Sequence, residues 1–278
     1  MLIAQLTDLH VRPAGRAAYR VVETNALVER AFAAVAALRE RPDLVVMTGD
    51  LTDCGLAEEY EQLAELIARY LDMPVYVVPG NHDRRENFRE GLGHLPGVRD
   101  DAGFVQYVVD SDAMPMRLVM LDSVVPGKGY GDLCDARFDF LERALTDAKG
   151  KPTSIFLHHS PMASGILHMD EIGLQSHRRL ADVIRRHSHV EAVFCGHSHR
   201  CIAGTFAGKR LQIAPSVAHQ VRFSLAEEES LAQFVMEPPS YLLHKWIPGH
   251  GLVSHQLFVE NYAGPFPFVL DKDYPGQH

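Results

Sequence analysis

The sequence is poor in cysteine and lacks the cysteine spacings of structural zinc sites and disulfide-rich domains. Only four cysteines occur among its 278 residues, at Cys54, Cys134, Cys195 and Cys201. No two of them have the CxxC spacing of a zinc-binding or redox pair. A sulfur-rich zinc site and a disulfide framework are therefore not expected. Reduced thiols in a cytoplasmic protein are the simplest interpretation.

Long apolar runs and an excess of basic residues are also absent. No apolar run approaches the roughly 20 residues that a membrane-spanning helix needs. The first apolar run follows Met1 so closely that no signal peptide is expected. The formal net charge of -9 and the lack of Lys/Arg runs provide no basic surface for DNA or RNA. We therefore expect neither a membrane partner nor a polymeric nucleic acid partner.

The chain has enough apolar residues to bury one large core, since 46% of it is hydrophobic. Five short apolar runs are typical of buried strands, at residues 3–6, 44–47, 75–78, 154–157 and 192–195. Helical periodicity lies between these runs, over residues 21–41, 58–71, 135–148 and 176–187. This alternation predicts an α/β fold with a mainly parallel sheet built by right-handed crossovers.

The rest of the chain predicts further strands and a different C-terminal part. Apolar segments at residues 104–109, 117–121, 202–206 and 210–213 form a second group of expected strands. After Pro215 the alternation fades, and the proline and glycine pattern predicts hairpins and loops. We therefore divide the chain into a main domain over residues 1–220 and a C-terminal segment over residues 221–278.

Polar motifs begin where each of the five strand-like runs ends. They are Asp8-x-His10, Gly49-Asp50, Gly80-Asn81-His82-Asp83, His158-His159 and Gly196-His197-Ser198-His199. The carboxyl ends of parallel strands meet at one edge of a sheet, so these side chains are expected to converge. On an extended backbone, residues two apart such as Asp8 and His10 point to the same side. Carboxylate, imidazole and amide ligands suit divalent metals that hold water and phosphoryl oxygens.

Each of these residues also has an ordinary structural explanation when it is considered alone. An aspartate or asparagine that follows a strand is usually a turn or cap residue. Histidines outside the motifs, such as His244, are expected to be solvated or packed. Independent strand ends rarely acquire matching ligands, however, so the whole set favours a two-metal hydrolytic site.

The order of the motifs resembles that of the calcineurin-like metallophosphoesterases, which are binuclear hydrolases on a four-layer αββα sandwich. Residues 38–43, 169–173 and 261–265 are similar to the bacterial branch of glycerophosphodiester and class III cyclic-nucleotide phosphodiesterases. The resemblance implies a catalytic domain over residues 1–220. It further implies that residues 221–278 form a small cap or oligomerisation segment and that the protein is a homo-oligomer.

The resemblance also implies a ligand set for two divalent transition-metal ions. One metal would be held by Asp8, His10, Asp50 and His199, and the other by Asp50, Asn81, His158 and His197, with Asp50 as the bridge. Iron, manganese, zinc and cobalt all accept such ligands, so the metal identity stays open. The family pattern selects His158 as the ligand, whereas the residues themselves leave His159 as an alternative.

The function implied by the resemblance is hydrolysis of small phosphodiesters by a metal-bridging hydroxide. His82 would protonate or hydrogen-bond the leaving oxygen, and Asp83 would orient His82. The residues implied to contact the substrate are Asn81, His82 and His219. Nearby arginines, namely Arg12, Arg84, Arg85 and Arg200, are more simply rim charges than phosphate ligands. A phosphomonoesterase and a catalytically inactive scaffold for protein binding are the alternatives.

Overall fold

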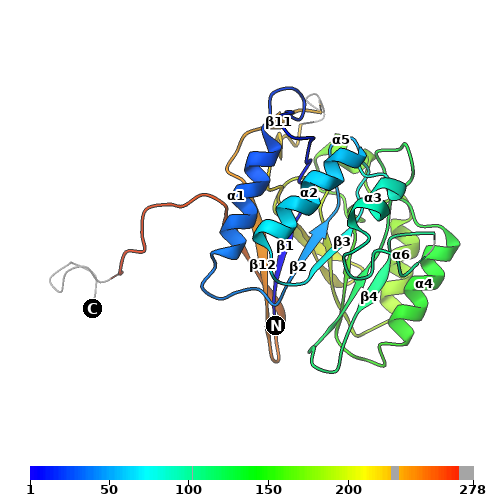
Figure 1. Cartoon of the computed structure of the whole chain (residues 1–278). Coiled ribbons are helices and arrows are strands. Elements are labelled where there is room, and N and C mark those ends of the chain that lie inside the picture. Colours follow the sequence, from blue (N-terminus) through cyan, green and yellow to red (C-terminus); the bar gives the residue numbers. More distant parts are fainter. Residues whose placement is uncertain (102, 227–231, 269–278) are drawn as a thin grey trace.

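Two β-sheets pack face to face in the computed structural model, which describes residues 1–101, 103–226 and 232–268 (Figure 1). The strand order of the first sheet is β13-β12-β1-β2-β3, and that of the second is β4-β5-β6-β7-β9-β8. The first sheet comprises β1 (Leu2–Leu6), β2 (Leu44–Thr48), β3 (Val75–Val78), β12 (Ser240–Ile247) and β13 (Gly251–Phe258). The second comprises β4 (Tyr107–Val109), β5 (Arg117–Met120), β6 (Thr153–Phe156), β7 (Val190–Cys195), β8 (Ile202–Phe206) and β9 (Lys209–Ile213). A separate ribbon pairs β10 (Gln220–Val221) with β11 (Phe234–Val235).

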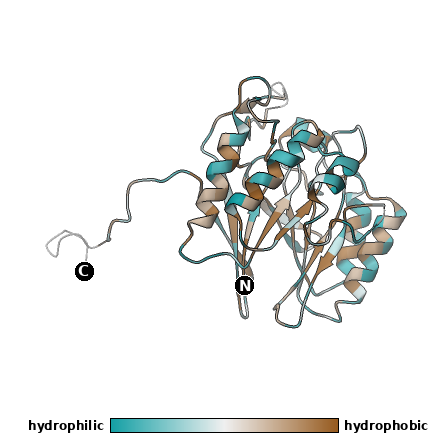
Figure 2. Cartoon of the chain, viewed as in Figure 1, coloured by the Kyte–Doolittle hydropathy of each residue, from teal (hydrophilic) through white to brown (hydrophobic). Residues whose placement is uncertain are grey.

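Helices cover the outer faces of both sheets. The helices are α1 (Thr24–Ala36), α2 (Ala57–Tyr70), α3 (Arg85–Leu92), α4 (Asp135–Thr146), α5 (Leu167–Glu171) and α6 (His177–Arg186). Apolar side chains of α1 and α2 belong to the same core as the first sheet, and those of α4 and α6 pack on the second. In Figure 2 the helices contain both teal and brown residues, whereas the strands are mostly brown. The expected four-layer αββα sandwich is confirmed.

The central strands β6 and β7 of the second sheet are largely buried on both faces. On β7, Phe194 belongs to the core between the sheets, whereas its neighbours Val193 and Cys195 face α4 and α6. The Phe194 ring stacks on Phe156 at 4.8 Å and meets His244 of β12 at 4.4 Å, across the interface between the sheets. Burial of both faces explains why these strands are continuous apolar runs rather than alternating ones.

The predicted helices are present, but the first is shorter than expected. Helix α1 begins at Thr24 rather than near residue 21, and it ends at Ala36. Residues 18–22 instead form a tight turn in which Tyr19 and Arg20 have positive φ angles of 49° and 65°. Because a helix requires negative φ, it cannot begin inside this turn.

The C-terminal part contributes a hairpin to the first sheet. Strand β12 pairs antiparallel with β1, with Ala4 opposite Leu243, and β13 continues the sheet. The expectation of hairpins after Pro215 is therefore correct, but this hairpin is built into the main sandwich. Residues 260–268 leave the body as an arm, drawn in red in Figure 1. The segment 221–278 also includes residues 227–231 and 269–278, which lie outside the described residues.

None of the described helices combines the length and the apolar character that crossing a bilayer requires.

Candidate metal centre

The seven predicted ligands come together where the two sheets present their strand ends. Asp8 and His10 follow β1, Asp50 follows β2 and Asn81 follows β3, whereas His158 follows β6 and His197 and His199 follow β7. All of them are buried except Asn81, which is partly exposed. Their atoms fall into two neighbouring groups, with Asp50 close to both.

Left-handed backbone conformations orient most of these side chains toward the centre. Five of the seven have positive φ: 53° at Asp8, 49° at His10, 47° at Asp50, 71° at His197 and 53° at His199. The expected explanation, an extended backbone with residues two apart on one side, is therefore wrong, although the convergence that it predicted is present. Non-glycine residues with positive φ are uncommon and cluster at functional sites.

Two motif glycines are required by close approach. A Cβ atom at Gly80 would lie 2.2 Å from the Asp50 carboxylate, and one at Gly196 would lie 2.0 Å from Thr7 Oγ1. A side chain at Gly80 would therefore displace the loop that carries Asp50, and one at Gly196 would displace the loop that carries Thr7 and Asp8. The glycines therefore allow strand ends from different parts of the chain to crowd around the same small volume.

The first group contains Asp8, His10 and His199. Nε2 of His10 lies 3.3 Å from Nε2 of His199, which is 3.3 Å from Oδ1 of Asp8. Oδ2 of Asp50 is 3.9 Å from Nε2 of His10. The donor atoms of these four residues could share one metal ion.

The second group contains Asn81, His158 and His197. Nε2 of His158 lies 3.1 Å from Oδ1 of Asn81 and 3.2 Å from Nδ1 of His197. The same nitrogen is 3.3 Å from Oδ2 of Asp50. One carboxylate oxygen of Asp50 therefore faces imidazoles of both groups, which is the position expected of a bridging ligand.

The outer nitrogen of each imidazole is held by an acceptor. His10 Nδ1 contacts Asp53 Oδ1 at 3.2 Å, His158 Nδ1 contacts the Thr48 carbonyl at 2.7 Å, His199 Nδ1 contacts the His219 carbonyl at 2.7 Å, and His197 Nε2 contacts the Ile172 carbonyl at 3.1 Å. Since a carbonyl or carboxylate only accepts, each of these nitrogens carries the hydrogen of the neutral ring. Such outer partners typically orient metal-ligating histidines.

With the hydrogen on the outer nitrogen, the inner nitrogen of each neutral ring has a free lone pair, as a metal ligand requires. The inner nitrogens of neutral His10 and His199 present lone pairs to each other, and so do those of His158 and His197. Facing lone pairs repel unless a cation lies beside them. Oδ1 of Asp8 is also buried without a hydrogen-bond partner among the described residues. The donor set therefore fits divalent cations held by nitrogen and oxygen.

The electrostatics of the centre also favour positive charge. Burial alone raises the pKa of Asp50, but the adjacent His158 and His82 hold it well below its ordinary value. Burial likewise opposes ionisation of Asp8, yet His199 lowers its pKa to about 2. For His158, burial lowers the pKa, whereas the charge of Asp50 raises it to about 9, so this position favours a positive charge whether a proton or a metal ion supplies it. Both carboxylates are therefore anions that require a nearby cation.

The geometry also distinguishes the two adjacent histidines. His158 turns its inner nitrogen toward Asp50, whereas Nδ1 of His159 lies 2.8 Å from the Ser123 hydroxyl. The His159 ring packs edge-on against His158 and 4.7 Å from His197. His159 therefore does not face Asp50, but its Nε2 is buried without a hydrogen-bond partner among the described residues, and His159 lies close enough to His158 and His197 to share an ion with them.

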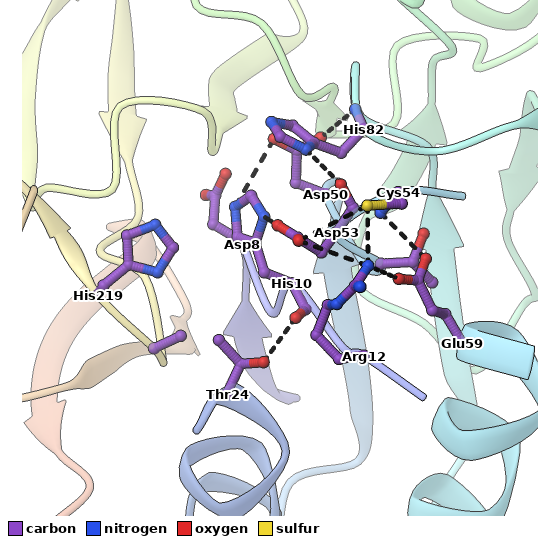
Figure 3. Close-up of polar contacts among 12 residues, drawn as sticks. Asp8, His10, Arg12, Thr24, Asp50, Asp53, Cys54, Glu59, His82 and His219 are labelled. Atoms are coloured by element: carbon purple, nitrogen blue, oxygen red, sulfur yellow. Dashed lines mark hydrogen bonds and ion pairs between the residues drawn. The ribbon is translucent and has the colours of Figure 1, made fainter. Parts of the chain in front are cut away.

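His82 lies at the mouth of the centre. Its backbone N–H donates to Oδ1 of Asp50 at 2.8 Å, and its Nδ1 contacts the Asp53 carbonyl at 2.7 Å. Its ring meets His10 edge-on at 4.7 Å, and both residues lie beside Asp50 in Figure 3. Of the two ring nitrogens of His82, Nδ1 is therefore the one that the Asp53 carbonyl engages.

Asp83 occupies a different position from the one expected. Its carboxylate accepts hydrogen bonds from the backbone N–H groups of Gly80 at 2.9 Å and Leu51 at 3.1 Å, and from the Tyr60 hydroxyl at 3.0 Å. Burial and the charge of Asp50 raise its pKa to about 6. Asp83 therefore ties the loops after β2 and β3 together, and the group that contacts His82 Nδ1 is the carbonyl of Asp53.

Sequence reasoning missed Asp53, and it assigned His219 only by resemblance. Asp53 orients His10, and its one sequence signal is its position three residues after Asp50. The His219 ring lies 5.0 Å from that of His10 and 4.6 Å from that of His199. Figure 3 shows His219 on the side of His10 away from His82. Its Nδ1 is buried without a partner among the described residues.

Three of the four neighbouring arginines are paired with carboxylates. Arg12 contacts Glu59 and Asp53 (Figure 3), Arg85 holds Asp122 through two hydrogen bonds, and Arg200 pairs with Glu237. Carboxylates of the protein therefore largely neutralise these three arginines, as expected for rim residues. Arg84 is exposed beside His82.

The model of the calcineurin-like phosphoesterase family matches residues 1–201 of this chain. The chain belongs to the calcineurin-like phosphoesterases. A solved structure of a dimetal phosphatase from Danio rerio superposes with a TM-score of 0.64 and covers 94% of this chain and 99% of that one. Since the two sequences are only 16% identical, this similarity is evidence for a shared fold and not for a shared activity.

Three curated relatives resemble this phosphoesterase more closely in sequence. The "Probable glycerophosphodiester phosphodiesterase GpdQ" of Arcobacter nitrofigilis is 37% identical and covers 98% of each chain. The glycerophosphodiester phosphodiesterase GpdQ of Enterobacter lignolyticus is 35% identical over 96% of this chain and 94% of its own length. The 3',5'-cyclic adenosine monophosphate phosphodiesterase CpdA of Escherichia coli is 30% identical over 79% of this chain and 77% of its own length.

Proposed function

We propose that this protein is a phosphodiesterase that uses two divalent metal ions to hydrolyse small phosphodiesters, either glycerophosphodiesters or 3',5'-cyclic nucleotides. The observation that carries the proposal is the pair of imidazole couples on either side of one carboxylate oxygen of Asp50. The names of the relatives support this substrate range.

The proposed ligands divide between the two groups. Asp8, His10, Asp50 and His199 would hold one metal, and Asp50, Asn81, His158 and His197 the other. Divalent cations bound there lower the pKa of water and neutralise charge on phosphoryl oxygens. We propose iron, manganese, zinc or cobalt, because each accepts this mixture of nitrogen and oxygen ligands.

The residues of the chain then position the reaction. Asn81 and His219, on opposite sides of the centre, would contact the phosphate and its ester group. Water adds to phosphorus, the ester P–O bond breaks, and the departing alkoxide needs a proton. His82 is proposed to hydrogen-bond or protonate that oxygen through Nε2, because its Nδ1 is held by the Asp53 carbonyl. Asp83 would act as a positioning residue by fixing the loop that carries His82.

We also propose that the segment 221–278 serves as a cap and oligomerisation segment beside a catalytic domain over residues 1–220. Because β12 and β13 are strands of the first sheet, the described parts that we propose for this role are residues 232–234, which line the cavity of the centre, and the arm over residues 260–268. Tyr262, Phe266 and Phe268 of the arm are 61%, 71% and 100% exposed. Truncation after Val259 should lower the mass of the oligomer measured by light scattering.

We also propose a cytoplasmic location, which fits the four free cysteines.

A kinetic screen tests the proposed function. The purified protein is treated with a chelator, reloaded with each metal in turn, and assayed on diesters and on the matching monoesters. We expect diester hydrolysis to disappear with the chelator and to return with metal. Monoester hydrolysis above diester hydrolysis would favour the phosphomonoesterase alternative. Metal-loaded protein without either activity would favour an inactive scaffold.

A further inference from the structure

A strained turn presents an aromatic ring at the mouth of the metal centre. Ala18 and Val22 exchange backbone hydrogen bonds of 2.8 and 2.9 Å, and the turn between them contains Tyr19 and Arg20, both with positive φ. Tight turns of this hand normally use glycine or asparagine. Strain of this kind is retained where the surrounding structure enforces it, often beside a functional site.

The surroundings of the turn do enforce it. Ala18 and Val22 are buried in a small apolar cluster with Leu27 and Ala218, and Phe234 packs against this cluster. Ala218 immediately precedes His219. The cluster therefore fixes the turn to the loop that carries His219, and it leaves Tyr19 46% exposed.

Three rings form a continuous surface that leads outward from the centre. The Tyr19 ring lies 5.2 Å from Phe234 with an angle of 31° between the planes, and 5.2 Å from His219, which it meets edge-on. His219 and Phe234 are 5.1 Å apart. We name these three residues the aromatic shelf. Its inner member, His219, contacts the rings of His10 and His199.

The shelf lines one cavity together with the proposed metal ligands. This cavity of about 400 Å³ includes His10, Asp50 and Asn81, and also His168, Met169 and Ile172 from α5 and the residues after it. A phosphate at the metal centre would therefore carry its ester group past the shelf. An exposed ring face offers stacking to a planar group but little to a flexible polyol.

We propose that Tyr19 is a specificity-determining residue and that the aromatic shelf stacks a planar heteroaromatic or aryl group on one ester arm of the substrate. The inference rests on the proposed diesterase function and selects among its substrates. Diesters with a nucleobase would be preferred over those with glycerol arms. Stacking of one base on an aromatic side chain typically changes affinity by about 5- to 150-fold.

The test compares substrates that differ in their ester arms. The metal-loaded full chain is assayed on 3',5'-cyclic AMP, on methyl p-nitrophenyl phosphate and on glycerophosphoglycerol. In Tyr19→Leu, we expect kcat/KM for cyclic AMP to fall by about 10-fold, mainly through KM, with glycerophosphoglycerol unchanged. Tyr19→Phe should keep wild-type preference. Val21→Ala changes an exposed side chain of the same turn and is the matched control.

The aryl substrate and a second variant sharpen the result. A fall for the aryl diester as well as cyclic AMP means that the shelf accepts any planar ring, whereas a fall for cyclic AMP alone narrows the ligand to a nucleobase. Phe234→Leu should give the same selective loss if Tyr19→Leu does not fold. Calorimetric binding of adenosine 5'-monophosphate, compared with glycerol 3-phosphate, should show the same selectivity without turnover.

Equal losses for cyclic AMP and glycerophosphoglycerol, or no loss for either, would overturn the role of Tyr19. This failure differs from failure of the proposed function, in which the metal-loaded wild-type protein would hydrolyse none of the three diesters.

Discussion

The two sheets contribute different chemistry to the candidate metal centre. The loops after β1, β2 and β3 supply both carboxylates, Asp8 and Asp50, together with the amide of Asn81 and one imidazole. The loops after β6 and β7 supply imidazoles, among them His158 and His197. Neither sheet contains a complete group, because the partners closest to Asp8 and Asp50 include histidines of the second sheet.

This division makes the centre a link between the two halves of the sandwich. Anionic side chains on one half face lone pairs of neutral imidazoles on the other, so cations bound between them would hold the halves together. Any ion that binds the folded state alone stabilises it, by about 2.7 kcal/mol at a concentration 100 times its Kd.

The largest effect is expected for Asp50→Ala, which removes the carboxylate nearest to both groups. Turnover should fall by about 10⁴-fold or more, as happens when one member of a set that acts as a unit is lost. Added metal should not restore it. The measurements are diester turnover and metal content by mass spectrometry, with Asp50→Asn as the variant of equal size. Normal turnover with two bound metals would show that Asp50 is not the bridge.

His82→Ala tests a residue of the first sheet that faces the substrate rather than a metal. Turnover of diesters with poor leaving groups should fall by about 10² to 10⁴-fold, the usual range for general acid–base catalysis. Activated aryl diesters should lose less, and metal content should stay constant. If all leaving groups suffer equally, or if metal is lost, the assignment to the leaving oxygen is wrong.

Asp53→Asn should have a smaller effect, because Asp53 acts through His10. Without the carboxylate that holds Nδ1 of His10 at 3.2 Å, metal affinity should fall by about 10- to 100-fold. Activity at saturating metal should largely recover. Titration of the chelated protein with metal measures the change. Asp72→Asn, at an exposed aspartate paired with Arg41, serves as the control and should leave the affinity unaltered.

The smallest effect concerns His244, which lies between the same two sheets but outside the centre. Its Nε2 contacts Oε1 of Gln5 at 3.0 Å, and its ring packs on Phe194. Burial, with smaller effects of Arg210 and His255, lowers the pKa of His244 from 6.5 to about 3. The buried ring of His244 is therefore neutral at physiological pH.

The sign of the pH dependence follows from this lowered pKa. Below about pH 6.5 the unfolded state takes up a proton at His244, whereas the folded state does not until about pH 3. The contribution of His244 to stability is therefore present above pH 6.5 and is lost as the pH falls. Between about pH 6.5 and 5.5, the wild type should lose about 1 kcal/mol more unfolding free energy than His244→Gln.

Denaturant unfolding at both pH values measures this difference. His250→Gln, at an exposed histidine of the turn between β12 and β13, is the matched control. A pH dependence in His244→Gln equal to that of the wild type would mean that His244 titrates normally in the folded protein.

Local patterns in the sequence are sufficient to locate the strands, most helices and the converging residues. A buried strand is an apolar run, and the residue at which polarity begins is also where the strand ends, so Asp8, Asp50 and His158 were locatable from local pattern alone. Helices such as α2 and α4 followed from periodicity because their apolar faces repeat along a short stretch of chain.

The way in which these elements meet could not be predicted from local patterns. The left-handed turns at Asp8 and His197, the pairing of β12 with β1, and the direction in which His158 rather than His159 faces Asp50 all depend on contacts between distant segments. Likewise, the Asp53 carboxylate and the Tyr19 ring acquire their positions from partners that no local pattern identifies. Periodicity reports which face of an element is buried, whereas the partner of each buried nitrogen or ring is set by long-range packing.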